Sequence, residues 1–238
     1  SALGGRILVV DGDLGLANAD QLLGVQAGST LWDVVQGKTR IEDAAIETRF
    51  GVSLLPACSG RTEMAELPAD ARSDLVAAIR SLSEAFDFVI IDTAAGIGET
   101  ALGLAQAGDL VLAVATPDPT SARDAFSIMK ILAKERGVRR IELVANMVSS
   151  DREGEELFRK LSSVTCKFLP LALGYAGAVV RDPCMARAVV ERTPAFAAFP
   201  NALASKQIAR LAAHVVTLDR ELGARVAASS ETESGRDD

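Results

Sequence analysis

The sequence is poor in histidine, cysteine and long apolar runs, and each shortage argues against a class of protein. His214 is the single histidine in 238 residues, which argues against a Ser-His-Asp triad and excludes a multi-histidine metal centre. Cys58, Cys166 and Cys184 are widely spaced and form no C-x-x-C, so they indicate a reducing compartment rather than a disulfide framework or zinc site. No window reaches the roughly 18 apolar residues that a membrane-spanning helix requires.

Basic residues are also outnumbered. The formal net charge is -7, with 25 Lys and Arg against 32 Asp and Glu, and such a chain is poorly suited to binding nucleic acid through its bulk charge. Hydrophobic residues make up 49% and charged residues 24%, as is typical of a globular domain. We expect one domain over residues 1–226 and a disordered acidic tail over residues 227–238.

Short apolar runs alternate with segments of helical spacing, which predicts an α/β fold. The alternation is typical of βαβ units in a doubly wound, mostly parallel sheet with helices on both faces. The predicted strands are Arg6–Asp11, Gly51–Leu55, Phe86–Asp92, Leu110–Ala115, Ile141–Ala145 and Cys166–Leu173. The predicted helices are Asp70–Ala85, Ser121–Arg136, Asp151–Ser163 and Asn201–Leu222.

Ligands bind such sheets at the carboxyl ends of the strands, and two predicted strands end in aspartate. The run that ends at Asp92 has the Walker B pattern, in which a strand directs a carboxylate at Mg²⁺ beside bound phosphates. Gly96 follows it and allows backbone to approach a phosphate. Asp11 and Asp13 follow another strand; one is placed to help hold the metal's water shell and the other to orient an attacking water. Turn formation and helix capping are the alternative roles.

Seven stretches, in the same order, resemble the MinD/ParA class of deviant-Walker ATPases. Within that class the chain is most similar to the FlhG type, also called YlxH or FleN, which regulates flagellar number and placement. The most specific stretch is DGDLGLANAD, and the "G-IP-D" loop departs from the family in having Val180 in place of proline. The stretches are Val9–Gly24, Leu54–Gly60 with Met64–Leu67, Asp92–Ile97, Thr116–Ala125, Asn146–Val148, Gly177–Asp182 and Phe199–Ser205.

The resemblance implies a P-loop NTPase fold with ATP and Mg²⁺ as cofactors, and an ATP-dependent homodimer that hydrolyses slowly. It implies that Asp13 positions the water and that Asp11 and Asp92 serve Mg²⁺, through water. Asn146 and Asp182 would meet the adenine. The implied partners are the flagellar GTPase FlhF, flagellar switch proteins or a flagellar transcription activator. The implied location is the cytoplasm, with peripheral binding at the inner membrane as an alternative that the acidic C-terminal segment opposes.

One family feature has no counterpart in the sequence. The Gly-rich phosphate loop with paired lysines, and the strand before it, would lie one helix before Arg6. None of the six lysines here follows a Gly-rich loop, and that loop supplies most of the phosphate binding. We therefore expect the N-terminally truncated part of an intact ATPase, inactive in hydrolysis as printed. The alternatives are a non-catalytic adaptor without nucleotide and a ParA-type partition ATPase, which the net charge disfavours.

Loss of a central strand has a structural consequence. The strands that end at Asp92 and Ala115 should face each other across a gap, with backbone groups unpaired and apolar side chains such as Val89, Ile91, Val111 and Val114 exposed. Such edges recruit other chains. We therefore expect residues 1–238 alone to aggregate and not to bind ATP measurably.

Overall fold

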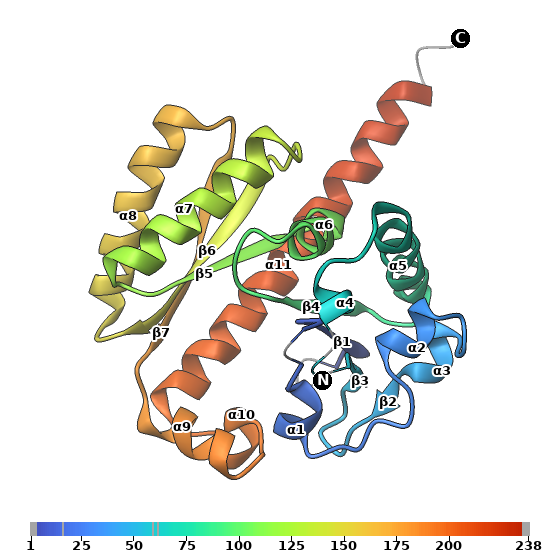
Figure 1. Cartoon of the computed structure of the whole chain (residues 1–238). Coiled ribbons are helices and arrows are strands. Elements are labelled where there is room, and N and C mark those ends of the chain that lie inside the picture. The colour runs from blue at the N-terminus through green and yellow to red at the C-terminus, as the bar shows by residue number, and fades with distance from the viewer. Residues whose placement is uncertain (1–3, 16, 59, 61, 235–238) are drawn as a thin grey trace.

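The computed structural model describes residues 4–15, 17–58, 60 and 62–234, and its seven described strands form two sheets (Figure 1). Leu16 and Ser59 of the family stretches, and residues 235–238 of the expected tail, lie outside the described residues. The first sheet has the order β2 (Ile46–Glu47), β3 (Ser53–Leu55), β1 (Ile7–Gly12), β4 (Phe88–Thr93). The second has the order β5 (Val111–Ala115), β6 (Arg140–Val148), β7 (Ala172–Val180).

Neighbouring strands pair in parallel throughout both sheets, except that β2 is antiparallel to β3. Helices connect the strands and cover the sheets. They are α1 (Ala19–Leu23), α2 (Leu31–Val35), α3 (Ile41–Ala44), α4 (Thr62–Ala65), α5 (Ala69–Ser81, followed by a 3-10 turn at Leu82–Glu84), α6 (Glu99–Ala107), α7 (Pro119–Lys134), α8 (Asp151–Phe168), α9 (Pro183–Val190), α10 (Ala195–Ala198) and α11 (Leu203–Ser234).

Each sheet has its own core. In the first, Leu8 and Val10 of β1 are fully buried and pack with residues of α5. In the second, Ile141 and Leu143 of β6 pack with α7 and α8, while Val144 packs toward α11 on the opposite face. Both faces of β6 are covered, and its middle, Leu143–Ala145, is an apolar run, as expected for a parallel strand between helix layers.

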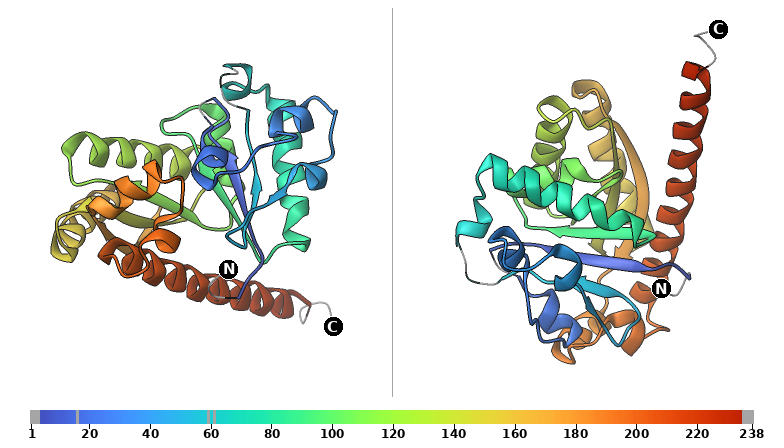
Figure 2. Two further views of the ribbon diagram at one scale, coloured as in Figure 1. Left: turned by 90° about the horizontal axis from the view of Figure 1, so that it is seen from below. Right: turned by 90° about the vertical axis from the view of Figure 1, so that its right-hand side faces the viewer.

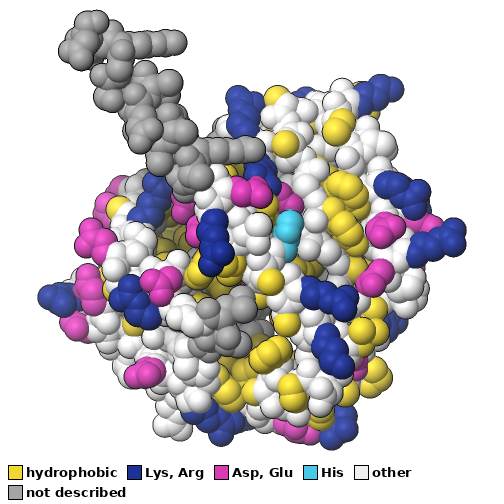
Figure 3. Space-filling model, turned by 180° about the vertical axis from the view of Figure 1, so that it is seen from behind, with side chains coloured by type: hydrophobic (Ala, Val, Ile, Leu, Met, Phe, Trp, Pro, Cys, Tyr) yellow, Lys and Arg dark blue, Asp and Glu magenta, His cyan; other side chains and the backbone are white. Residues whose placement is uncertain are grey.

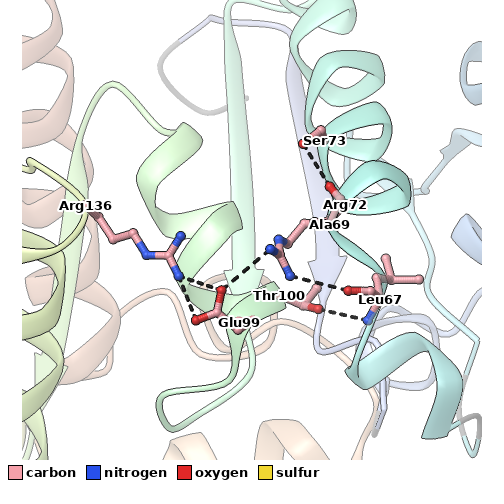
Figure 4. Close-up of polar contacts among 7 residues, drawn as sticks. All are labelled: Leu67, Ala69, Arg72, Ser73, Glu99, Thr100 and Arg136. Atoms are coloured by element: carbon pink, nitrogen blue, oxygen red, sulfur yellow. Dashed lines mark hydrogen bonds and ion pairs between the residues drawn. The ribbon is translucent and has the colours of Figure 1, made fainter.

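Helix α6 joins the two halves of the molecule. Leu104 belongs to the first core and Leu102 to the second. At the start of α6, the Glu99 carboxylate lies between two guanidinium groups, 2.6 Å from Arg136 Nη2 and 3.5 Å from Arg72 Nη2 (Figure 4). Arg72 lies on α5 and Arg136 follows α7, so this charge cluster connects the helix layers of both sheets.

Five of the six predicted strands are confirmed, and the sixth is wrong. Helix α8 continues to Phe168 because Thr165 is buried on the same face as Leu157 and Leu161, and the strand begins only at Ala172. The start of β7 was missed because Gly174 interrupts the run of branched apolar residues by which strands were recognised. A Cβ at this position would meet the buried Glu142 carboxylate, so a side chain there would require Glu142 to move.

The C-terminal segment also differs from the expectation. Helix α11 extends to Ser234, so residues 227–234 are helical where a disordered tail was predicted. Alanines in this segment favour helix, and the polar composition gave no sign of it. Figure 2 shows α11 running along one face of the molecule, past both sheets, and projecting beyond them.

Strands β4 and β5 are the facing edges of the two sheets, as predicted. Residues of both line one cavity of about 370 Å³, which we call the β4–β5 groove. Of the four side chains predicted to be exposed, Val114 is 59% exposed, whereas Val89, Ile91 and Val111 are partly buried against the cores. Ile90, which the prediction did not name, is 53% exposed. Seen from behind, hydrophobic side chains are exposed at several places on the surface, some of them around a hollow on this face (Figure 3).

Candidate functional site

Asp11 lies near the carboxyl end of β1 and is 3% exposed. Its carboxylate accepts three backbone hydrogen bonds, from Asp13 N at 3.3 Å, Asn18 N at 3.2 Å and Ala19 N at 3.1 Å. The last two donors lie at the start of α1, so Asp11 fixes the turn that connects β1 to that helix. Its structural role and its predicted metal role therefore use the same carboxylate, which retains further lone pairs.

Asp92 is placed beside Asp11 by the register of β1 and β4, in which the two residues are partners. Burial, with the charge of Asp92 as a smaller cause, raises the pKa of Asp11 despite its three backbone donors. Partial burial and then the charge of Asp13 raise the pKa of Asp92. The structure thus places near one another the three carboxylates that the sequence predicted, and each of Asp11 and Asp92 feels the charge of another of them.

Gly12 allows β1 and β4 to come unusually close at this point. A Cβ at this position would lie 2.7 Å from the Asp92 carbonyl oxygen, so only glycine fits. Gly96, in the loop after β4, has a φ of +103° and nothing within 4 Å of its missing Cβ. Glycine is thus required by contact at one position and by backbone conformation at the other, and the loop around Gly96 is open to a ligand.

The carboxylates do not form a metal cage by themselves. Among the described residues, no group of three or more His, Cys, Asp or Glu is arranged to hold a metal ion. Mg²⁺ is usually bound by one or two carboxylates together with water and phosphate oxygens rather than by an all-protein cage. Asp11 and Asp92 fit that mode, since they are oxygen donors in a site where extra negative charge is already costly.

Asn146 and Asp182 lie at the corresponding edge of the second sheet. Asn146 pairs in register with Val179 of β7, which brings it to the strand end that Asp182 follows. The Asn146 side-chain oxygen accepts a hydrogen bond from Met147 N at 2.9 Å, and Met147 has a φ of 55°. This bond leaves the Asn146 amide nitrogen and a second lone pair of its oxygen for other partners.

The Asp182 carboxylate already has two backbone partners. It accepts hydrogen bonds from Cys184 N at 2.9 Å, at the start of α9, and from Ala204 N at 3.3 Å, in the first turn of α11. These bonds hold the pKa of Asp182 below its usual value. Asp182, which was predicted to contact adenine, thus fixes the starts of two helices. Any contact with a base would be made by the loop around Asp182.

Asp118 is a residue whose role the sequence reasoning missed. It caps α7 by accepting from Thr120 N and Ser121 N, both at 3.0 Å, and the Thr116 hydroxyl donates to it as well. The hydroxyl first, and then the backbone donors, lower its pKa. Asp followed by Pro at the first helical position is a typical helix-start pattern, so the signal was present in the sequence.

The helices give no sign of a membrane span. In the part of the chain that the structure describes, no helix combines the length and the apolar character needed to cross a bilayer.

Comparisons with known proteins agree with this arrangement. A family model described as "Cellulose biosynthesis protein BcsQ" matches residues 1–216. The antiactivator FleN of Pseudomonas aeruginosa is 38% identical over 203 residues, which cover 85% of this chain and 72% of that protein. The flagellum site-determining protein YlxH of Helicobacter pylori is 30% identical over 215 residues, which cover 90% of this chain and 72% of that protein.

Solved structures show the same fold. The septum site-determining protein MinD of Pyrococcus horikoshii, in complex with Mg-ADP, superposes with a TM-score of 0.76 at 26% identity, over 93% of this chain and 87% of that chain. The cell division ATPase MinD of Pyrococcus furiosus gives a TM-score of 0.75 at 28% identity, over 91% of this chain and 88% of that chain. The chain therefore belongs to the family of the matching model and, within the MinD/ParA class, is an FlhG-like protein.

Proposed function

We propose that this chain is part of an ATP-dependent switch ATPase of the FlhG type, which regulates the number or placement of flagella. The observation that carries the proposal is the cluster of Asp11, Asp13 and Asp92 at the carboxyl ends of adjacent parallel strands. The register places Asp11 and Asp92 beside each other. Burial and neighbouring carboxylates raise the pKa of both, which supports a site where negative charge is costly. A divalent cation would relieve this penalty.

Each carboxylate has a separate role in the proposal. Asp11 and Asp92 face Mg²⁺, directly or through water, and Asp13 orients the water for attack on the terminal phosphate. Mg²⁺, when bound, neutralises charge on the phosphate oxygens. Asp11 also accepts hydrogen bonds from the backbone at the start of α1. These bonds fix the loop between β1 and α1, which contains Asp13. The open loop around Gly96 gives the phosphate end of the nucleotide room to approach β4.

The base lies at the second sheet in this proposal. Asn146 and the loop fixed by Asp182 are at the carboxyl edge of β6 and β7, so the nucleotide would extend from one sheet edge to the other. The P. horikoshii MinD that shares this fold was solved with Mg-ADP, which supports a nucleotide of this kind. The phosphate loop would come from a segment outside residues 1–238, because none of the six lysines follows a Gly-rich loop.

The partners proposed are a second copy of the protein, bound when ATP is present, and a flagellar component such as FlhF, a switch protein or a transcription activator. FleN is described as an antiactivator and YlxH as a flagellum site-determining protein, which supports a flagellar role. We propose a cytoplasmic location, with peripheral contact to the inner membrane as the alternative. A non-catalytic adaptor remains the second candidate, since residues 1–238 contain no phosphate loop.

The test uses the full-length gene product with Asp13→Ala. Asp13 orients water but does not build the dimer, so the variant should retain ATP-dependent dimerisation and lose most hydrolysis, by roughly 100-fold or more. Turnover and light scattering with ATP and Mg²⁺ measure the two properties. Asp74→Ala is the matched control, since Asp74 is an exposed aspartate on α5, and it should retain both.

Each outcome separates the candidates. Hydrolysis at the wild-type rate in Asp13→Ala would contradict the role of Asp13. A full-length wild-type protein that neither binds ATP nor hydrolyses it would instead establish the adaptor.

A further inference from the structure

Gln207 is a buried polar side chain that the proposed function does not use. It lies on α11 and is 5% exposed, and burying an amide is unfavourable unless both of its ends are hydrogen-bonded. Both ends have partners here. The Gln207 Oε1 atom accepts from Val180 N at 2.8 Å, and its Nε2 donates to the Asp151 carboxylate at 2.7 Å. The side chain therefore connects α11 to the last residue of β7 and the first residue of α8.

The outer edge of β7 explains why Val180 has a side-chain partner. Among the described strands, β7 pairs with β6 alone. Arg181 N donates to Val148 O of β6 at 2.8 Å, and successive backbone groups of a strand point alternately to its two sides. Val180 N therefore points away from β6, where no described strand pairs with it. The Gln207 oxygen takes the place of the acceptor that a neighbouring strand would supply.

A second link from α11 holds the loop that follows β7. Ala204 N donates to the Asp182 carboxylate at 3.3 Å. Ala204 and Gln207 are three residues apart, which places them on the same face of the helix, and both are buried. The loop from Val180 to Asp182, whose contact with a base belongs to the proposed function, is thus tied to α11 at both of its ends.

We infer that Gln207 is a positioning residue for the base site, where it fixes the end of β7 and the loop that holds Asp182. Val180 follows Val179, the register partner of Asn146, so the link also fixes the two parts of the base site relative to each other. Contact with a base rests on the proposed function, whereas the link itself does not. Because the phosphates are proposed to bind at the first sheet, the effect of Gln207 should be confined to binding of the base.

The link requires an amide at this position. One end accepts from a backbone N–H and the other donates to a carboxylate, and among side chains of this length only glutamine does both. Gln207→Glu retains an acceptor for Val180 N but places a second negative charge against Asp151. Asp151→Asn then supplies an amide that donates to the introduced carboxylate, so the double variant should restore the link.

The first experiment measures nucleotide binding by calorimetry in the full-length gene product. ATP is compared with inorganic triphosphate, which has no base. Gln207→Glu should weaken ATP binding about 10-fold, the loss expected from one hydrogen bond, and leave the affinity for triphosphate unchanged. Asp151→Asn alone retains an acceptor for the Gln207 amide and should bind ATP as wild type does. The double variant should recover most of the lost affinity.

The second experiment needs no nucleotide. Gln207→Met is similar in size and removes both hydrogen bonds, so the Val180 amide should exchange with solvent about 10-fold faster than in wild type. Lys206→Met, at the exposed neighbouring residue on α11, is the matched control and should leave that exchange unchanged. Both variants are measured in the full-length gene product.

Three results would overturn the inference. One is exchange at Val180 that Gln207→Met does not change. Another is an equal loss of ATP and triphosphate affinity in Gln207→Glu, which would indicate general destabilisation instead of a loss confined to the base. The third is a double variant that binds ATP no better than Gln207→Glu. If wild type bound no ATP but Gln207→Met still accelerated exchange at Val180, the proposed function would be contradicted, whereas the link between Gln207 and the loop would be supported.

Discussion

The carboxylates at the strand ends of the two sheets differ in what surrounds them. At the first sheet, burial and neighbouring carboxylates raise the pKa of Asp11 and Asp92. At the second, hydroxyl and backbone donors lower the pKa of Asp118 and Asp182. The second pair caps helices and is electrostatically satisfied within the protein. The first pair carries an unfavourable charge, so the two edges of one fold serve different purposes.

Asp11 shows why burial decides the difference. It accepts three backbone hydrogen bonds, more than Asp182, yet its pKa is shifted in the opposite direction. Its side chain is 3% exposed, and the loss of hydration outweighs the donors. The Asp11 carboxylate is held in place by backbone hydrogen bonds, and its negative charge is unfavourable there. It could therefore bind a cation without changing its position.

Of the substitutions that test this difference between the two sheets, Asp11→Ala should have the largest effect on stability. Three backbone N–H groups would lose their acceptor in a partly buried turn, so the free energy of unfolding should fall by about 1–3 kcal/mol. Asp92→Asn is the matched control within the same cluster. It removes repulsion without orphaning those donors and should leave the protein as stable or slightly more so. Urea unfolding at pH 7 measures both, and equal losses in the two variants would contradict the distinction.

The pH dependence of stability sharpens the comparison. A raised folded-state pKa contributes stability that is complete below the ordinary value of 3.8 and is lost as the pH rises through the folded pKa. Wild type should therefore lose stability relative to Asp92→Asn as the pH rises from 3.8 through the raised folded pKa of Asp92. Asp118 and Asp182 act oppositely, since their contribution is present above 3.8 and is lost as the pH falls through their lowered pKa values. If the difference in unfolding free energy between wild type and Asp92→Asn did not change with pH, the pKa of Asp92 would not be raised in the folded protein.

Much of this architecture could be predicted from local pattern, and the failures have physical causes. Five strands appeared as apolar runs because parallel strands are buried on both faces, and Asp11 and Asp92 were found because they end such runs. The start of β7 was missed because Gly174 yields space to the buried Glu142. Strand β2 has only two residues, too few for a pattern. The pairing of Asp11 with Asp92 depends on strand register, which a sequence does not specify.

A smaller effect is expected at the caps of the second sheet. Asp182→Ala removes an acceptor shared by the starts of α9 and α11, whereas Asp118→Ala frees only α7. Both should lower Tm by a few degrees at most, and Asp182→Ala should lower it more because two helices lose a tether. Thermal unfolding followed by circular dichroism checks the order. The reverse order would mean that the Ala204 contact contributes little.

The smallest effect should come from Glu99, which connects the halves that carry the two kinds of carboxylate. Arg136 first, through a hydrogen bond and its charge, and then Arg72 hold the pKa of Glu99 below its usual value. The Glu99 side chain is 59% exposed, so water screens much of this attraction, and Glu99→Gln should lower Tm only slightly at pH 7.

Because the folded pKa is lowered, the contribution of Glu99 to stability is present above about 4.5 and disappears as the pH falls through the folded value. Wild type and Glu99→Gln should therefore converge in acid, and 1 M salt should narrow their difference at pH 7. Arg136→Gln and the double variant complete the cycle. Additive effects of the two substitutions would show that the ion pair does not couple the halves and that α6 joins them through Leu102 and Leu104 alone.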